Sequence, residues 1–238
     1  MDKVEGARKK GRQYVLFVVF FLGGAFLLIN LISHKLYMLA SLLILIVSFF
    51  PFMIRFERRP LAARELVMIS ILAAVTALSR IPFASIPSVQ PTTFVIIMTG
   101  LVFGSETGFV VGNVGAFISN IFLGQGPWTP WQMYAWGLIG LCSGTLKNSK
   151  AMKSPTILAI FGFLTGILFG WIMNLWIVVG ILQTITWGEF ITLYITSFYF
   201  DLAHGITNAF LLLVFSKSWR KRLGRFQQKY GLLDGKDI

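Results

Sequence analysis

The last apolar segment of the chain carries its polar residues on one side of a helix. Tyr194, Ser197, Asp201, His204 and Asn208 follow one another at spacings of three or four positions, which places them on one helix face. An ionised carboxylate within a bilayer costs about 3 kcal/mol or more, so Asp201 should face a bundle interior and have a partner. The simpler interpretation is an internal Asp201–His204 hydrogen-bonded pair that only organises the bundle. The length of the stripe favours the other interpretation, the polar wall of a substrate cavity.

Amide side chains form a second set of candidate binding residues. Asn113 and Asn120 lie seven positions apart, and therefore on one face of their segment. Each amide could make an interhelical hydrogen bond worth only about 0.6 kcal/mol. Alternatively, the amides converge with neighbouring tryptophans on a pocket that is open to the outside and suits a large, mostly uncharged ligand. The other amides of this set are Gln90, Gln125, Gln132 and Asn174, and Trp171 is one of the neighbouring tryptophans.

The segment Gly124–Met133, GQGPWTPWQM, is predicted to form an ordered aromatic loop between two apolar segments. Each proline fixes its own φ and restricts the residue before it, so the loop should hold one conformation. Its tryptophans, Trp128 and Trp131, could anchor the chain at a membrane interface. Equally, the loop could close as a lid over a small-molecule site.

Several enzyme motifs are absent from the sequence. It contains no G-x-x-x-x-G-K-[ST] phosphate-binding loop, no H-E-x-x-H and no G-x-S-x-G. Cys142 is the single cysteine, which excludes an internal disulfide and a cysteine metal cluster. We therefore predict a non-enzymatic chain without catalytic residues, a metal site or a bound cofactor. Such a chain needs a gradient or a partner to move a ligand.

The elements that must position these residues are membrane-spanning helices. Hydrophobic residues make up 56% of the chain, charged residues 13%, and the mean hydropathy is +0.76. Apolar runs that cross a bilayer need roughly 20 residues. The eight candidate spans are Tyr14–Ile32, Leu36–Ile54, Glu65–Leu78, Pro91–Phe103, Thr107–Leu123, Trp131–Gly144, Pro155–Leu182 and Glu189–Phe215. The sequence therefore predicts an all-α polytopic membrane protein.

Positive charge indicates the orientation of these spans. Of the 21 Lys and Arg residues, 19 lie in the segments 1–12, 55–64, 145–154 and 216–238, and only Lys35 and Arg80 lie in the opposite connectors. The positive-inside rule places the rich side in the cytoplasm, together with both termini. We therefore expect a multi-pass protein of the cell membrane whose basic tail faces solvent or lipid headgroups rather than nucleic acid.

The character of the sequence changes after the second span. Residues 1–60 form a basic segment and an aliphatic two-helix hairpin, residues 61–216 a six-helix bundle, and residues 217–238 a basic cytoplasmic tail. Small residues one turn apart, which let helices approach closely, recur within the bundle. They are Ala73/Ala77, Gly100/Gly104, Gly108/Gly112, Gly140/Gly144, Gly162/Gly166 and Gly166/Gly170. Tight internal packing is the expected role, with subunit docking an alternative for Ala73 and Ala77.

The part from about residue 64 to 215 resembles the substrate-binding S component of energy-coupling factor (ECF) type ABC transporters. The resemblance rests on RELVMISILAAVTALSR (64–80), IPSVQPTTFVIIMTGLVFG (86–104), GFVVGNVGAFISNIFLGQGPWTPWQM (108–133) and FDLAHGITNAF (200–210). The segments SVQP and GQGPWTPWQM are most similar to the cobalamin-type branch. The N-terminal hairpin departs from the six-helix pattern of that family.

The resemblance implies a mechanism and partners. An S component captures a vitamin, here expected to be cobalamin, outside the cell and delivers it with a transmembrane T subunit and two ATPases that use ATP. In that family an A-x-x-x-A pattern meets the T subunit, and Ala73 and Ala77 match it. The resemblance also implies ligand contacts by Gln90, Asn120, Gln125, Trp128, Trp131 and the last-helix stripe. Two alternatives stay open: another vitamin or nucleobase-like precursor on the same scaffold, or a membrane scaffold that transports nothing.

Overall fold

The computed structural model describes residues 62–180 and 186–231. In these ranges the chain forms six α-helices and two short 3₁₀-helices, and no strand. Their order is α3 (Ala63–Leu78), η2 (Ile81–Phe83), α4 (Thr92–Phe103), α5 (Ser105–Leu123), α6 (Thr129–Thr145), η3 (Ala151–Lys153), α7 (Pro155–Gly180) and α8 (Trp187–Tyr230). The predicted N-terminal hairpin, Tyr14–Ile54, lies outside the described residues.

The helical, multi-pass character predicted from the sequence is supported by these elements. Four helical segments are long and apolar enough to cross a membrane: Ala63–Phe83, Ser105–Leu123, Pro155–Val178 and Trp187–Tyr230. Helix α8 does not end at Phe215, as the last predicted span does, but continues to Tyr230. The basic segment that follows Phe215 thus begins as an extension of α8, and the predicted boundary at residue 216 falls inside this helix.

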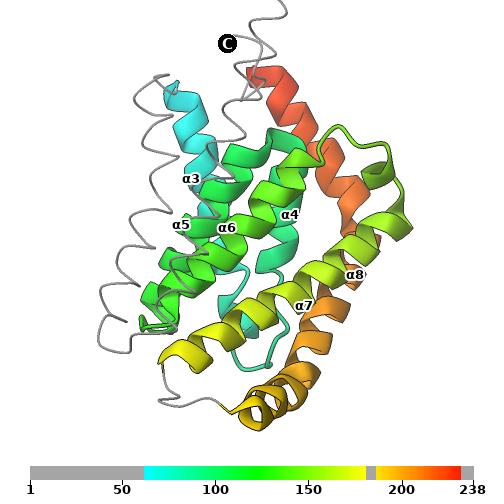
Figure 1. Ribbon diagram of the computed structural model, residues 1–238. Helices are drawn as coiled ribbons and strands as arrows, with labels where there is room; N and C mark the ends of the chain where they lie inside the picture. Colours follow the sequence, from blue (N-terminus) through cyan, green and yellow to red (C-terminus); the bar gives the residue numbers. More distant parts are fainter. Residues whose placement is uncertain (1–61, 181–185, 232–238) are drawn as a thin grey trace, which may run out of the picture.

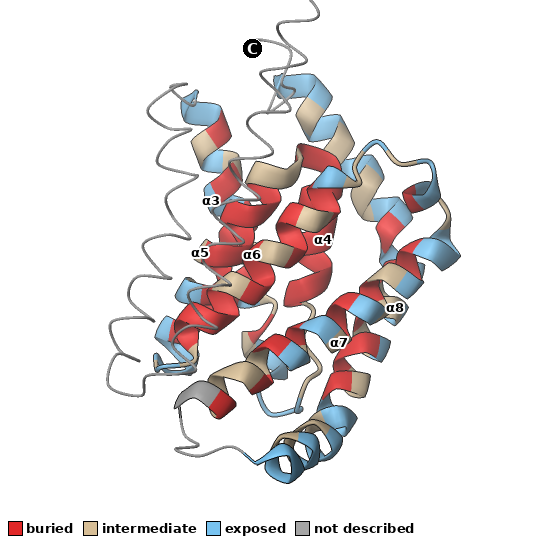
Figure 2. Ribbon diagram, in the orientation of Figure 1, coloured by how far each residue is buried: buried red, intermediate tan, exposed pale blue. Residues whose placement is uncertain are grey.

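Helix α4 is the centre of the bundle. All 12 of its residues are buried, and Figure 2 shows it red along its length. A helix that is apolar on every side is stable only when neighbours cover it all round, and here α5, α6 and α8 do so. Gly104 ends α4 with φ 101°, a conformation that glycine adopts without steric cost. The chain therefore turns at once into α5, which begins at Ser105.

Glycines let the helices of the bundle approach one another closely. A Cβ atom at Gly140 of α6 would overlap the carbonyl group of Gly108 on α5. A Cβ atom at Gly166 of α7 would lie 2.6 Å from the Cα of Gly205 on α8. These contacts confirm the packing role predicted for Gly140 and Gly166, whereas a Cβ atom at Gly104 would have no neighbour within 4 Å.

Helices α7 and α8 pack against each other beside the α3–α6 group (Figure 1). A capping box starts α8, in which the Thr186 hydroxyl accepts from the backbone N–H of Glu189 and the Glu189 carboxylate accepts from the backbone of Thr186. The buried residues of α8 form one stripe: Asp201, His204, Gly205, Asn208, Leu212 and Ser216. This stripe places the only carboxylate of the central part of α8 in the interior.

Candidate functional site

A cavity of about 410 Å³ is lined by α7, α8 and the loop that precedes α4. Its size lies within the range of small-molecule sites. The loop contributes Ser88 and Gln90 to the lining. Ser88 has φ 61°, the one described non-glycine residue with a positive φ, and such uncommon conformations cluster at functional sites. The two helices contribute Phe169, Gly170, Met173, Asn174, Ile177, Leu193, Thr196, Ser197, Phe200, Asp201 and His204.

His204 connects the cavity to the core of the bundle. Its Nε2 atom lies 2.8 Å from the Thr93 hydroxyl of α4, and the Trp136 indole N–H donates to the same hydroxyl over 2.9 Å. Phe169 stacks on Trp136 at 4.6 Å between ring centroids and meets the His204 ring edge-on at 5.0 Å. One wall of the cavity is therefore a fixed aromatic and hydrogen-bonded assembly from α4, α6, α7 and α8.

Asp201 is buried in the cavity wall without a protein partner among the described residues. Its exposed fraction is 5%, and its Oδ2 atom has no hydrogen bond. A Cβ atom at Gly170 would overlap Oδ1, so glycine on α7 makes the room for this carboxylate. The Asp201–His204 pair considered from the sequence is not formed, because the His204 ring turns away to Thr93 on α4. The Asp201 carboxylate thus keeps a hydrogen-bonding capacity that no described residue uses.

Of the remaining polar residues in the stripe on α8, one lines the cavity and two make contacts elsewhere. Ser197 lines the cavity and accepts a hydrogen bond of 2.6 Å from the Asn174 amide. Asn208 donates to the carbonyl of Gly162 on α7 over 3.3 Å and contributes to helix packing. Tyr194 points away from the cavity, and its hydroxyl donates to the carbonyl of Trp171 over 3.2 Å.

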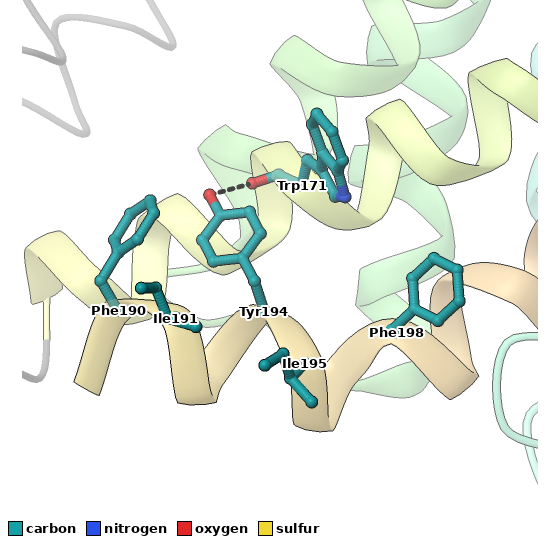
Figure 3. Close-up of a pocket in the computed structure, with 6 residues that line it drawn as sticks. All are labelled: Trp171, Phe190, Ile191, Tyr194, Ile195 and Phe198. Atoms are coloured by element: carbon teal, nitrogen blue, oxygen red, sulfur yellow. Dashed lines mark hydrogen bonds between the residues drawn. The ribbon is translucent and has the colours of Figure 1, made fainter. Parts of the chain in front are cut away.

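Tyr194 and Trp171 belong to a second hollow, on the outer face of α7 and α8 (Figure 3). This aromatic groove has a volume of about 540 Å³ and is lined by Trp171, Phe190, Ile191, Tyr194, Ile195 and Phe198. Ile195 is 69% exposed, so the groove faces outward, where a membrane protein meets lipid. Its lining carries no carboxylate or amide, and we therefore place the candidate site in the cavity.

Arg80 is the most informative residue that sequence reasoning missed. It was assigned to an outer connector, yet its exposed fraction is only 9%. Its Nη1 atom donates to Asn120 Oδ1 over 2.6 Å and to the Ser119 hydroxyl over 2.9 Å, and its guanidinium lies 5.2 Å from the Trp136 ring centroid. Its isolation on the Lys- and Arg-poor side of the sequence was the available signal. We call Arg80, Ser119, Asn120, Thr129 and Gln132 the Arg80 cluster.

The Arg80 cluster brings together two of the predicted amides, away from the cavity lining. The Asn120 amide donates to Gln132 Oε1 over 2.8 Å and to the Thr129 hydroxyl over 3.1 Å. Gln125 is exposed, and its carbonyl oxygen accepts from Thr129 over 2.9 Å. The cluster ties the C-terminal end of α3 to α5 and α6, and Trp136 contacts both sides, since its ring lies beside Arg80 and its N–H donates to Thr93.

The predicted aromatic loop is shorter than Gly124–Met133. Helix α6 begins at Thr129, so Trp131 and Gln132 lie in its first turns, and Trp131 is 2% exposed. Trp128 instead packs against Trp176 of α7 at 5.9 Å between ring centroids. Pro130 stands in the first turn of α6, where proline favours a helix start, and this signal marks the boundary.

Asn113 and the pair Ala73 and Ala77, which were also predicted as site residues, are packed between helices. The Asn113 amide donates to the Phe109 carbonyl of its own helix over 2.8 Å and lies against Gly137 of α6. Ala73 and Ala77 are each 1% exposed, so neither side chain forms an open docking face in this conformation. Docking through this pair stays a prediction that requires the two side chains to become uncovered.

Comparisons with known proteins agree with this architecture. The family model described as "ECF-type riboflavin transporter, S component" matches residues 61–221. A UPF0397 protein of Aliivibrio fischeri (strain MJ11) is 29% identical over 123 residues, which cover 44% of this chain and 67% of the relative. A UPF0397 protein of Vibrio atlanticus (strain LGP32) is 28% identical over 88 residues, 35% of this chain and 48% of the relative. No solved structure gives a significant match.

Proposed function

This chain belongs to the family of ECF-type riboflavin transporter S components, and we propose that it captures a vitamin of flavin size outside the cell. An S component is a binding subunit and not an enzyme. Family membership implies a small-molecule substrate, a transmembrane T subunit and two ATPases. Those ATPases supply the ATP chemistry, because this chain has no phosphate-binding loop.

The cavity between α7 and α8 is the observation that carries the proposal. It combines an aromatic wall around Phe169 with buried polar groups on α8, the composition typical of small-molecule sites. A membrane scaffold that only packs helices has no need of a carboxylate without a partner beside such a space. Asp201 would be costly there unless a ligand or water satisfied it.

The ligand that fits this proposal best is a flavin rather than cobalamin. The cobalamin-type branch suggested by the sequence has no support in the family match, whose description names riboflavin. A space of about 410 Å³ suits a drug-sized molecule, whereas cobalamin, a corrin ring with a nucleotide loop, is much larger. A flat isoalloxazine ring also suits the Phe169 wall, because aromatic rings prefer stacked or edge-to-face partners.

The proposed transport cycle places the cavity on the outer side of the membrane. The distribution of Lys and Arg supports cytoplasmic termini, which puts the loop before α4 outside. This loop and Trp128 then cover the ligand, and docking on the T subunit leads to release inside. The predicted hairpin of residues 14–54 would accompany the bundle in the membrane.

Titration of detergent-purified protein with riboflavin tests the proposal. We expect saturable, roughly one-to-one quenching of flavin fluorescence, and no saturable signal from cobalamin in calorimetry. Thiamine and a nucleobase serve as further ligands, since they represent the other small heteroaromatic compounds the scaffold could take. Binding of cobalamin but not riboflavin would contradict the flavin assignment, and binding of none of them would contradict the capture function.

A further inference from the structure

We propose that Asp201 and Gln90 select a ligand through its hydrogen-bond donors and exclude ligands that carry a negative charge. The inference rests on the proposed function and names the class of vitamin: a flat heteroaromatic compound with N–H or O–H donors and no phosphate or carboxylate. For a flavin, this means the free vitamin rather than its phosphate ester.

Both buried polar atoms that lack a partner in the cavity lining are acceptors. They are Asp201 Oδ2 on α8 and Gln90 Oε1 on the loop before α4. A buried acceptor without a donor costs roughly 1–3 kcal/mol, and more when it is charged. The two atoms come from different elements, so a bound ligand that donates to both would connect the loop to α8.

Several side-chain donors of the lining are already engaged. The Thr196 and Ser197 hydroxyls donate to backbone carbonyls of α8, at 2.8 Å to Thr192 and 3.3 Å to Tyr194. The Asn174 amide donates to Ser197. Nε2 of His204 lies at hydrogen-bonding distance from the Thr93 hydroxyl. The hydroxyl and amide donors that α7 and α8 contribute to the lining are thus engaged within the protein, whereas Asp201 Oδ2 on α8 has no partner.

The lining also lacks a cation that could receive an anionic group. None of the residues that line the cavity is Lys or Arg, and Asp201 is the only carboxylate among them. The buried guanidinium of Arg80 is not part of the lining; it lies over the Trp136 ring, and its Nη1 atom donates to Asn120 and Ser119. A phosphate or carboxylate in the cavity would therefore face a like charge with no cation in the lining to compensate it, which weakens binding.

Three flavins test the role of ligand donors and of ligand charge separately. They are riboflavin, 3-methylriboflavin, which lacks the ring N–H, and riboflavin 5′-phosphate, which carries negative charge. With the full-length protein in detergent, we expect riboflavin to bind at least about tenfold more tightly than either of the others. Asp201→Asn removes the negative charge and one acceptor atom. It should weaken riboflavin about tenfold and bring the affinities of riboflavin and its phosphate within about threefold of each other.

Two variants complete the test. Gln90→Met, which keeps the side-chain length and removes the acceptor, should weaken riboflavin without improving binding of the phosphate. Glu189→Gln removes a carboxylate from the same helix outside the cavity and should change none of the ratios; thermal unfolding of each variant confirms that it is folded. Equal affinity of the wild-type protein for all three flavins, or unchanged ratios in Asp201→Asn, would overturn the inference while the capture function stands. Failure of all three flavins to bind would overturn the flavin assignment as well, and the capture function would then depend on the other ligands of the screen.

Discussion

Replacing Gly140 with valine is expected to destabilise the bundle by at least about 3 kcal/mol. The Cβ atom would overlap the carbonyl group of Gly108, which is backbone and cannot rotate away as a side chain can. Helices α5 and α6 would have to separate, and the contacts of the buried Trp136 region with α5 would be lost. Thermal unfolding in detergent measures the effect, with an expected decrease in Tm of roughly 6–12 °C.

Gly224 provides the matched control for this substitution. It also lies in a helix, α8, but a Cβ atom there has no neighbour within 4 Å. Gly224→Ala should therefore raise the stability slightly, by about 0.5–1 kcal/mol, because alanine loses less backbone entropy in a helix. A Gly140→Val protein as stable as the wild type would show that α5 and α6 do not approach as described.

Replacing Arg80 with methionine is expected to cost about 2–3 kcal/mol of stability. The change keeps an unbranched side chain but removes the donors to Ser119 and Asn120, whose oxygens are then left buried with fewer partners. It also removes the guanidinium from the Trp136 ring. A double-mutant cycle with Asn120→Ala should give a coupling energy of about 1–2 kcal/mol, because the two residues share one hydrogen-bond network.

The control cycle combines Arg80→Met with Thr145→Ala, at the opposite end of α6 from the Arg80 cluster. Thr145 is exposed, and about 20 Å of helix separates it from Gln132. The two changes should be additive within about 0.5 kcal/mol. Unchanged or increased stability of Arg80→Met would contradict the account, since it would mean that the hydrogen bonds do not offset the cost of burying the guanidinium.

The helices of this protein could be predicted well because their cause is local. Long apolar runs and the three-or-four spacing of polar residues on α8 are visible in the sequence, and they place Asp201 and His204 on a buried face. The burial of Asp201 followed from the same pattern, but the partner expected for its carboxylate is absent among the described residues. The hydrogen-bond partners of these side chains could not be predicted.

Partners depend on contacts between helices that are distant in sequence. The bond between Thr93 and His204 joins positions 111 residues apart, and no spacing within one segment indicates it. The sequence places Arg80 in a connector between two apolar segments, and nothing in that position indicates that its side chain is buried. Its burial depends on Asn120 and Trp136, which α5 and α6 bring to it.

Small residues and ligand identity were the least predictable features. Ala73 and Ala77 have the same spacing whether they face a neighbouring helix or another subunit, so their burial could not be derived from it. One fold can bind many different ligands. The cobalamin assignment depended on two segments read as loops, and part of one of them, GQGPWTPWQM, forms the first turns of α6. The ligand size and donor chemistry that we propose rest on the cavity instead.

The central claim is that a flavin binds in the cavity between α7 and α8, and neighbouring residues on α8 test it directly. Thr196 lines the cavity, whereas Ile195 lines the aromatic groove on the outer face, and both are exposed enough to accept a larger side chain. We would titrate riboflavin into Thr196→Trp and Ile195→Trp proteins and follow flavin fluorescence. The account predicts that Thr196→Trp abolishes binding and that Ile195→Trp keeps the wild-type affinity. Loss of binding in Ile195→Trp alone, or wild-type binding in both variants, would contradict it.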